Sequence, residues 1–521
     1  MINQRFLIAG MLLGVALAGC ARLPVDSGRS DVTTLVRAHG QEGSAAGDLE
    51  ATRLLLAELA GRPLTRTDAV RLTLINNPKV TAEYARLGFA AAEVYDAGRL
   101  SNPTLSASVL VPDVGGEANQ VGFGLAQNFT NLLLLPSRKR FAEGEFERIK
   151  QAVAAKVLNS AADAEAAYYR LVGAWQIAAM REAVGRATQA AADLAQRFFE
   201  AGNISRLELA LQQAAASQGQ IDVADARAKV TEARYALNRQ MGLSATEDHW
   251  KILDRMPAPL VDEDSAPELL SLADASRLDL AAARQRVSLL ADALGVTRRF
   301  RLLGEFEAGV ETEREPDRSR ITGPTLSLEL PIFNQGRGRV ARAEAALQEA
   351  EADLRELEVS ISNGVQRAAA DVAVAKARAE HYRTSLIPLR EAIVARTQQE
   401  LNYMLEGQFQ LLLVKQQEYD AYQGYLEAVR DYWLARVELA REVGTVLPSS
   451  AGIGEVTLDA DTLIQPNGGK AQIQPGGTQM EKMEGMEGME GMDHSGHSMD
   501  DMPGMQKSQK PSDEPQHGDQ P

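Results

Sequence analysis

A methionine- and histidine-rich segment near the C-terminal end carries the residue types best suited to chemistry. Eight of the 14 methionines fall between Met480 and Met505, many of them three residues apart with Glu and Gly between them. The candidate metal ligands are Met480, Met483, Met486, Met489, Met492, His494, His497, Met499, Met502 and Met505. Thioether sulfur is a soft ligand suited to Cu(I) and, we expect, to Ag(I), while imidazole also takes Cu(II). Uncharged sulfurs keep binding at acidic pH, where thiolates become protonated.

The composition around this segment leaves two interpretations open. Residues 446–521 turn to Gly, Pro, Gln and Asp, which predicts a disordered tail without a packed core. Clustered methionines in such a tail have no core to fill, so packing does not explain them. The alternative is repeat expansion without function. The pattern favours metal binding and resembles the Met- and His-rich segments of bacterial copper-resistance proteins, without showing whether the tail transfers, buffers or senses ions.

The first twenty residues are predicted to export and anchor the chain. An apolar stretch from Phe6 to Ala18 follows a basic residue and is too short to span a bilayer stably. It runs into Leu17-Ala18-Gly19-Cys20, which resembles the bacterial lipobox, and Cys20 is the only cysteine in the chain. We therefore expect residues 1–19 to be a signal peptide and Cys20 to be lipidated rather than an inert buried thiol. Ala21, where an inner-membrane lipoprotein often has Asp, favours the outer membrane.

The overall composition excludes several classes of function. A net charge of -16 argues against a nucleic-acid partner, because phosphate binding needs a basic face. Aromatic residues make up only 5% of the chain, and Ala, Leu, Glu, Gln and Arg dominate its middle, as in long helices. We find no phosphate-binding loop, zinc-protease motif or nucleophile–base set, so we predict no enzymatic activity and no required cofactor.

Periodicity predicts two copies of one unit, residues 64–250 and 251–445, after a lipidated linker at 20–63. Helices are expected at 64–98, 138–200 and 205–241, and again at 268–301, 336–405 and 410–443, with Pro388 bending the second long one. Glycines break each long hairpin at Gly202 and Gly407, which are 205 residues apart. Such a repeat is too long for a solenoid and indicates a duplicated supersecondary unit.

Two pairs of alternating segments lie between the helices, at about 103–111 and 120–130, and at about 303–312 and 322–330. Period-2 alternation over about ten residues is typical of transmembrane barrel strands. Alternation places four carboxylates opposite the apolar face: Glu305, Glu307, Glu311 and Glu329. If that face lines a pore, these side chains favour cations, unless they only line water or are neutralised by Arg318 or Arg320.

Four strands cannot enclose a conducting pore, because even an eight-stranded barrel is filled by its own side chains. A pore therefore requires several chains, and a cyclic homo-oligomer is the simplest solution. Three copies would supply twelve strands, with the helices continuing as a tube. No other segment has eighteen consecutive apolar residues, so the strands are the expected membrane-crossing part.

From Leu64 to Gly444 the chain resembles the TolC family of outer-membrane efflux factors, specifically its lipidated heavy-metal branch. The resemblance rests on the lipobox, the tandem halves, the strand-to-helix transitions at 125–140 and 330–339, and the two hairpins. It implies a mainly α fold with a membrane β-barrel portion, made by a homotrimer with twelve strands and long coiled-coil helices. It also implies a periplasmic adaptor protein and an inner-membrane transporter as partners, and an outer-membrane location with the helices and the tail in the periplasm.

The hairpin tips are where the resemblance places adaptor contacts and gating. The candidates are Gly202, Arg206, Glu208, Gly407 and Gln408. The family commonly narrows this end with acidic residues near the second tip, but residues 407–415 contain no carboxylate. An acidic ring is therefore not carried over to this chain.

These observations leave three hypotheses. The first is a passive duct that exports copper or silver, and the second is a duct of the same architecture for organic solutes. The third is a metal-binding surface lipoprotein that conducts nothing.

Overall fold

The computed structural model describes residues 26–41, 46–111, 113, 118–247, 249–252, 255–453 and 457–458. The chain divides into two compact units, Met1–Gly469 and Lys470–Pro521, and every described residue belongs to the first. Cys20 and all ten candidate metal ligands of the tail lie outside the described residues.

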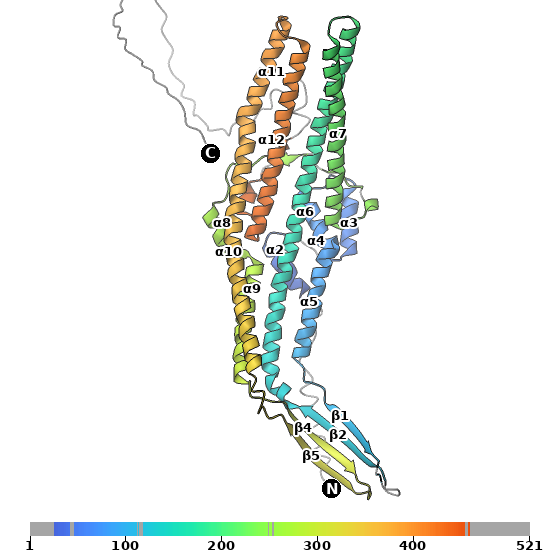
Figure 1. The fold of residues 1–521 in the computed structure, drawn as a ribbon, viewed down its shortest axis with the longest axis vertical. Coiled ribbons are helices and arrows are strands. Elements are labelled where there is room, and N and C mark those ends of the chain that lie inside the picture. The colour runs from blue at the N-terminus through green and yellow to red at the C-terminus, as the bar shows by residue number, and fades with distance from the viewer. Residues whose placement is uncertain are drawn as a thin grey trace, which may run out of the picture. The chain divides into compact units, whose positions relative to one another are not determined.

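The first unit is mainly helical, with one four-stranded sheet at one end and two helical hairpin turns at the other (Figure 1). The first half contains α4 (Arg66–Asn76), α5 (Pro78–Ala97), β1 (Thr104–Leu110), β2 (Gln120–Asn128), α6 (Phe129–Glu200) and α7 (Arg206–Met241). The second half contains α8 (Ala266–Ser276), α9 (Leu278–Arg299), β4 (Phe306–Arg314), β5 (Arg320–Leu328), α10 (Arg337–His381), α11 (Ile387–Asn402) and α12 (Gln408–Val443). The same order of elements therefore occurs twice.

The helical hairpins of the two halves correspond to each other at an offset of 202 residues in the sequence. Helices α7 and α12 both have 36 residues, and they end on the left-handed glycines Gly242 and Gly444. At this offset Gly202 corresponds to Met404, and both take a positive φ, of 76° and 59°. Gly407 instead has φ -88° as the N-cap of α12. The offset of 205 inferred from the two glycines is thus corrected, because Met404 rather than Gly407 makes the second turn.

Several predicted helix boundaries also change. The expected helix at 64–98 is split at Asn77, whose side chain caps α5 and is followed by Pro78 at the first helical turn. The expected helix at 268–301 is likewise split at Arg277. Helix α6 begins at Phe129, nine residues before the predicted start, because Asn128 caps it by accepting from the Asn131 amide at 3.1 Å. Pro136 is accommodated inside that helix.

The long helix of the second half is interrupted where α6 is continuous. A single π-helical turn, Tyr382–Leu386, separates α10 from α11, and Pro388 lies in the first turn of α11. Proline has no amide hydrogen to donate to the preceding turn, and a π-turn is one way for a helix to absorb that loss. The predicted bend at Pro388 is therefore a local change of helix type.

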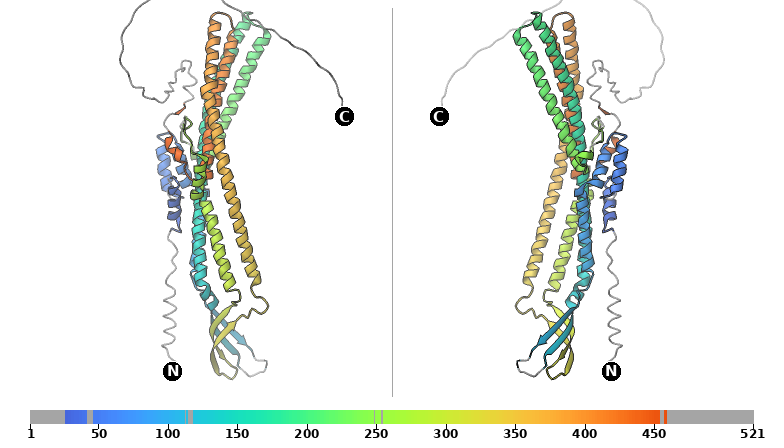
Figure 2. Two further views of the ribbon diagram at one scale, coloured as in Figure 1. Left: turned by 90° about the vertical axis from the view of Figure 1, so that its left-hand side faces the viewer. Right: turned by 90° about the vertical axis from the view of Figure 1, so that its right-hand side faces the viewer.

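Residues 20–63, predicted as a linker, include two helices, α2 (Arg29–Ala38) and α3 (Leu49–Leu59). They lie beside the middle of the long helices in both views of Figure 2. Val32 and Val36 are buried there, and Lys150 of α6 bonds Asp31 at 2.7 Å. The His39 ring also bridges the Leu35 and Ser276 carbonyl oxygens, so the N-terminal segment is attached to both halves.

The main core lies in this middle region, where α4, α6, α10 and α12 meet. Tyr169 of α6 stacks on Trp433 of α12 with ring centroids 5.4 Å apart. Trp433 donates from Nε1 to the Pro257 carbonyl at 2.8 Å, which attaches the connector between the halves to the core. Among the described residues no helix combines the length and the hydropathy needed to span a bilayer.

Candidate functional site

The sheet has the order β1-β2-β4-β5, so the hairpins of the two halves join through β2 and β4. All neighbouring strands are antiparallel, and the register places residues of one parity on one face. Leu105 lies opposite Leu125, which lies opposite Val310 across the next pair. One face is therefore apolar from one edge of the sheet to the other.

The apolar face is exposed in this chain. Leu105 is 74% exposed, Phe123 52%, Val310 56% and Leu326 70%. A contiguous apolar sheet face of this kind is rare on a soluble monomer and indicates contact with lipid or with another chain. The outer edges of β1 and β5 pair with no strand among the described residues, so the sheet also has two open edges.

The opposite face is polar and acidic. Glu307 and Glu311 lie on β4, where the register sets them beside Ser327 and Gly323 of β5. Gly122 and Gly124 lie on the same face of β2, and a Cβ at either would approach Ser108 or Ser106 to within 2.6 Å. Glycine at these positions therefore leaves room for the serines and for the Glu311 side chain.

The other two predicted carboxylates lie just outside the strands. Glu305 directly precedes β4 and Glu329 directly follows β5. The Glu329 amide donates to the Glu305 carbonyl at 2.8 Å, and the Glu305 amide donates to Oε2 of Glu329 at 3.2 Å. The structure thus brings these two together at the helix-side end of the sheet, with Glu307 and Glu311 farther along β4.

The sequence analysis missed Glu313, which extends the acidic face. It lies beyond the predicted end of the strand at about 312, but β4 continues to Arg314, and the Gln120 side-chain amide donates to the Glu313 carboxylate. Continuing the alternation by one more pair of residues would have found it. Arg320 pairs with Arg314 on the opposite face of the sheet, so it does not neutralise these glutamates within the chain.

Both polar and large apolar side chains are exposed at the hairpin tips. Arg206 and Glu208 are exposed on the first turn of α7, where the Glu208 amide donates to the Ser205 hydroxyl at 3.1 Å. Gln408 is exposed at the start of α12, while Met404 and Leu405 before it are 93% and 75% exposed. The large apolar residues of the second tip were not singled out from the sequence.

The two hairpins touch each other below the tips. Phe198 of α6 and Phe409 of α12 meet edge to face with ring centroids 6.4 Å apart. A cavity of about 140 Å³ follows, lined by α6, α7 and α12, with Val184, Thr188 and Tyr419 among its residues. Besides apolar side chains its lining includes Gln212, Gln416 and Lys415, and Lys415 pairs with Glu418.

Buried ionisable groups lie in the middle of the helices rather than at the sheet or the tips. Burial raises the pKa of Tyr168 to about 12, and burial with a hydrogen bond to Glu391 raises the pKa of Tyr422 far above its usual range. Arg436 is 3% exposed and pairs with Glu263. Within the described residues no group of His, Cys, Asp and Glu has the arrangement of a metal site.

Comparisons with known proteins identify solved structures that have a similar fold. No protein-family model and no curated protein matches the chain. Among solved structures, the CmeC outer membrane channel of Campylobacter jejuni is 14% identical, with a TM-score of 0.61 over 77% of this chain and 88% of CmeC. The transmembrane channel protein CusC is 14% identical, with a TM-score of 0.60 over 79% and 96%. The MtrE outer membrane channel of Neisseria gonorrhoeae is 15% identical, with a TM-score of 0.56 over 75% and 89%. The predicted fold class, mainly helical with a strand portion as in these channels, is confirmed.

Proposed function

We propose that this chain is the outer-membrane channel of a tripartite efflux system, which passively exports solutes from the periplasm to the exterior. The observation that carries the proposal is the two-faced sheet, with an exposed apolar face, an acidic face and two open edges. This arrangement suits a wall between lipid and water. The fold shared with outer-membrane channels supports it.

The open edges support a homotrimer. The unpaired groups of β5 in one copy can bond those of β1 in the next, which removes both edges when the ring closes. Three copies then provide twelve strands around one pore. In that ring the acidic face lines the lumen and the apolar face contacts outer-membrane lipid.

We further propose copper or silver ions as the exported solutes. Trimerisation places three copies of Glu307, Glu311 and Glu313 around the pore, and a ring of carboxylates attracts cations. The Met- and His-rich tail provides soft ligands for Cu(I) or Ag(I) in the same chain. Export needs no covalent step, and an inner-membrane transporter supplies the energy.

The hairpin tips are the proposed docking surface for a periplasmic adaptor protein. Exposed Leu207, Met404 and Leu405 provide an apolar contact, and Arg206 and Glu208 provide its charged rim. Lipidation of Cys20 would add a second attachment to the outer membrane, with the helices and the tail in the periplasm.

Two experiments separate the three hypotheses. Purified protein in planar bilayers should conduct, with a preference for cations that weakens when Glu307, Glu311 and Glu313 are changed to Gln. No conductance under any condition, including after deletion of the hairpin tips, would favour the non-conducting lipoprotein.

The second experiment tests the solute. A deletion strain, complemented with the full chain or with a chain ending at Ser450, is grown in copper, silver, zinc, cobalt and a panel of drugs. We expect hypersensitivity to copper or silver that the shortened chain rescues incompletely. Sensitivity to drugs alone, rescued equally by both chains, would favour the duct for organic solutes.

A further inference from the structure

Ten basic side chains lie on the segments that lead from the helices into the sheet and back. We name this set the basic collar: Arg99, Arg138, Lys139, Arg140, Arg298, Arg299, Arg301, Arg337, Arg339 and Arg342. All ten are exposed. Their segments, 96–101, 137–143, 298–305 and 329–344, contain only five carboxylates, whereas the whole chain has a net charge of -16. The collar is therefore a positively charged region on a negatively charged protein.

Hydrogen bonds join two segments of the collar to each other, and tie three of the four segments to the junction of the sheet and the helices. The Thr130 hydroxyl near the start of α6 donates to the Gly304 carbonyl at 3.0 Å, and Arg339 of α10 donates to the Arg301 carbonyl at 2.9 Å. Gln127 donates to the Ser101 carbonyl at 2.9 Å. Figure 1 shows α5, α6, α9 and α10 all ending beside the sheet.

Few of these charges are neutralised by carboxylates of the same chain. Arg337 and Arg339 lie in the first turn of α10, which has no acidic residue and carries the positive end of the helix dipole. Among the described residues, two of the ten have an ion pair: Lys139 with Glu143 at 3.7 Å and Arg298 with Glu344 at 2.5 Å. Positive charge kept against the helix dipole indicates an external anion.

The collar borders an apolar surface. Leu330, Ile332 and Phe333 in the turn between β5 and α10 are 65%, 66% and 100% exposed, and Leu302 beside Arg301 is 53% exposed. This turn continues from the sheet, whose apolar face is also exposed. A basic band next to an exposed apolar band has the chemistry of a bilayer interface, where headgroup phosphates lie above acyl chains.

We propose that the basic collar binds the phosphates of anionic phospholipid headgroups in the membrane leaflet nearest the helices. Arginine forks pair with phosphate oxygens, while Ile332 and Phe333 enter the acyl region below them. Bound phospholipid then fixes the depth and tilt of the sheet in the membrane. The proposal rests on the proposed function, since only a sheet inserted in a bilayer brings the collar to headgroup level.

The test measures lipid binding to the full chain. Protein in neutral detergent micelles is titrated with phosphatidylglycerol or with phosphatidylcholine, and bound lipid is counted by native mass spectrometry. The triple variant R138Q/R301Q/R337Q neutralises the collar, and the control R186Q/K229Q/R396Q removes three exposed charges from the helical hairpins. We expect roughly fivefold weaker phosphatidylglycerol binding per neutralised arginine, and no change in the control.

Several outcomes would overturn the proposal. Equal phosphatidylglycerol binding by wild type and collar variant would do so, as would an equal loss in the control or displacement of the lipid by inorganic phosphate at millimolar concentration. Conductance of the same preparations separates this proposal from the proposed function. A conducting channel with unchanged lipid binding contradicts the collar alone, whereas collar-dependent binding by a protein that never conducts contradicts the duct alone.

Discussion

In each half, a residue between the first two helices bonds a carbonyl near the end of the last helix. The two contacts are equivalent, but different side chains make them. In the first half Asn77, between α4 and α5, donates to the Gln240 carbonyl near the end of α7 at 2.8 Å. In the second half Arg277, between α8 and α9, donates to the Glu442 carbonyl near the end of α12 at 2.8 Å. The two halves share this contact and differ in the side chains that make it.

The halves differ most in how they use charge. In the first half the contact is made by a neutral and buried amide, since Asn77 is 3% exposed. In the second half it is made by an ion-pair cluster, in which Arg277 also bonds Asp279 at 2.7 Å and Glu442 at 3.2 Å. The comparison teaches that a repeated fold can be held by hydrogen-bond satisfaction in one copy and by charge pairing in the other.

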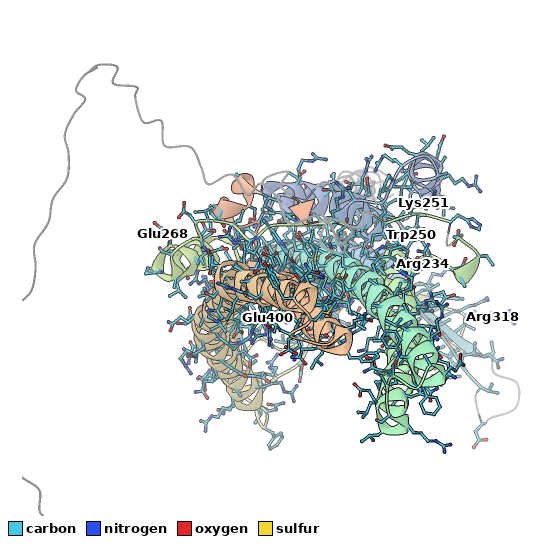
Figure 3. The ribbon with its side chains drawn as sticks, turned by 90° about the horizontal axis from the view of Figure 1, so that it is seen from above. Arg234, Trp250, Lys251, Glu268, Arg318 and Glu400 are labelled. Carbon is cyan, nitrogen blue, oxygen red and sulfur yellow. The ribbon has the colours of Figure 1, made fainter. Side chains whose placement is uncertain are left out.

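The largest expected effect concerns two arginines that are 202 residues apart. Arg436 is 3% exposed and pairs with Glu263, so Arg436→Ala leaves a partly buried carboxylate without its cation and should cost about 3–5 kcal/mol. Half-buried Arg234 lies 4.2 Å from the Trp250 ring centroid and bonds its carbonyl (Figure 3), so Arg234→Ala should cost less. Thermal unfolding followed by circular dichroism measures both, and equal losses would remove the distinction between the halves.

Substitution of Asn77, which makes this contact in the first half, should have the next largest effect on stability. Asn77→Ala removes the cap of α5 and the donor to Gln240, and we expect a loss of about 1–3 kcal/mol. Asn77→Ser keeps a capping oxygen but lacks the amide donor, and it should recover about 1 kcal/mol. If both variants unfold alike in urea titrations, then the cap contributes nothing and the donor accounts for the loss.

The hairpin turns should respond with opposite signs. Gly202 has φ 76°, so Gly202→Ala should destabilise the first tip by about 1–2 kcal/mol. Met404 has φ 59°, so Met404→Gly should relieve strain and stabilise the second tip by under about 1 kcal/mol. Amide hydrogen exchange at residues 198–209 and 400–411 reports each tip separately. Faster amide exchange at the second tip of the Met404→Gly variant would contradict the correspondence of Met404 with Gly202.

The smallest expected effect is a dependence on pH at Asp68, in the capping box of α4. Burial raises the pKa of Asp68, but hydrogen bonds from Arg62 and Thr65 outweigh burial and hold the pKa below its usual value. A lowered carboxyl pKa stabilises the fold above about pH 4, and the stabilisation is lost as pH falls through the folded-state pKa.

Asp68→Asn should therefore lower stability by under about 1 kcal/mol at pH 7, and the difference from wild type should vanish in acid. Glu268 is the equivalent residue of the second half, where it accepts from the Ser265 hydroxyl at 2.8 Å. Glu268→Gln is the matched control, measured by thermal unfolding between pH 2 and pH 7. A difference between Asp68→Asn and wild type that persists at pH 2 would exclude the carboxylate as its cause.

Much of the fold followed from local sequence patterns. The period-2 alternation at about 103–111 and 120–130 located β1 and β2 closely, because successive side chains of a strand point to opposite faces of the sheet. The correspondence between the halves was harder to predict, since Gly202 and Gly407 suggested an offset that the backbone does not follow. Only the φ angles show that Met404 makes the turn.

The sequence by itself determined the helical and strand periods, the two-faced character of the strands, and the Met- and His-rich composition of the tail. These features depend on neighbouring residues, and neighbouring residues are what a sequence displays. The tertiary structure decided which strands pair, how far β4 extends, and that ten dispersed basic residues form one collar. The pairing of β2 with β4 joins residues 179 to 193 positions apart, and no local pattern encodes a contact over that distance.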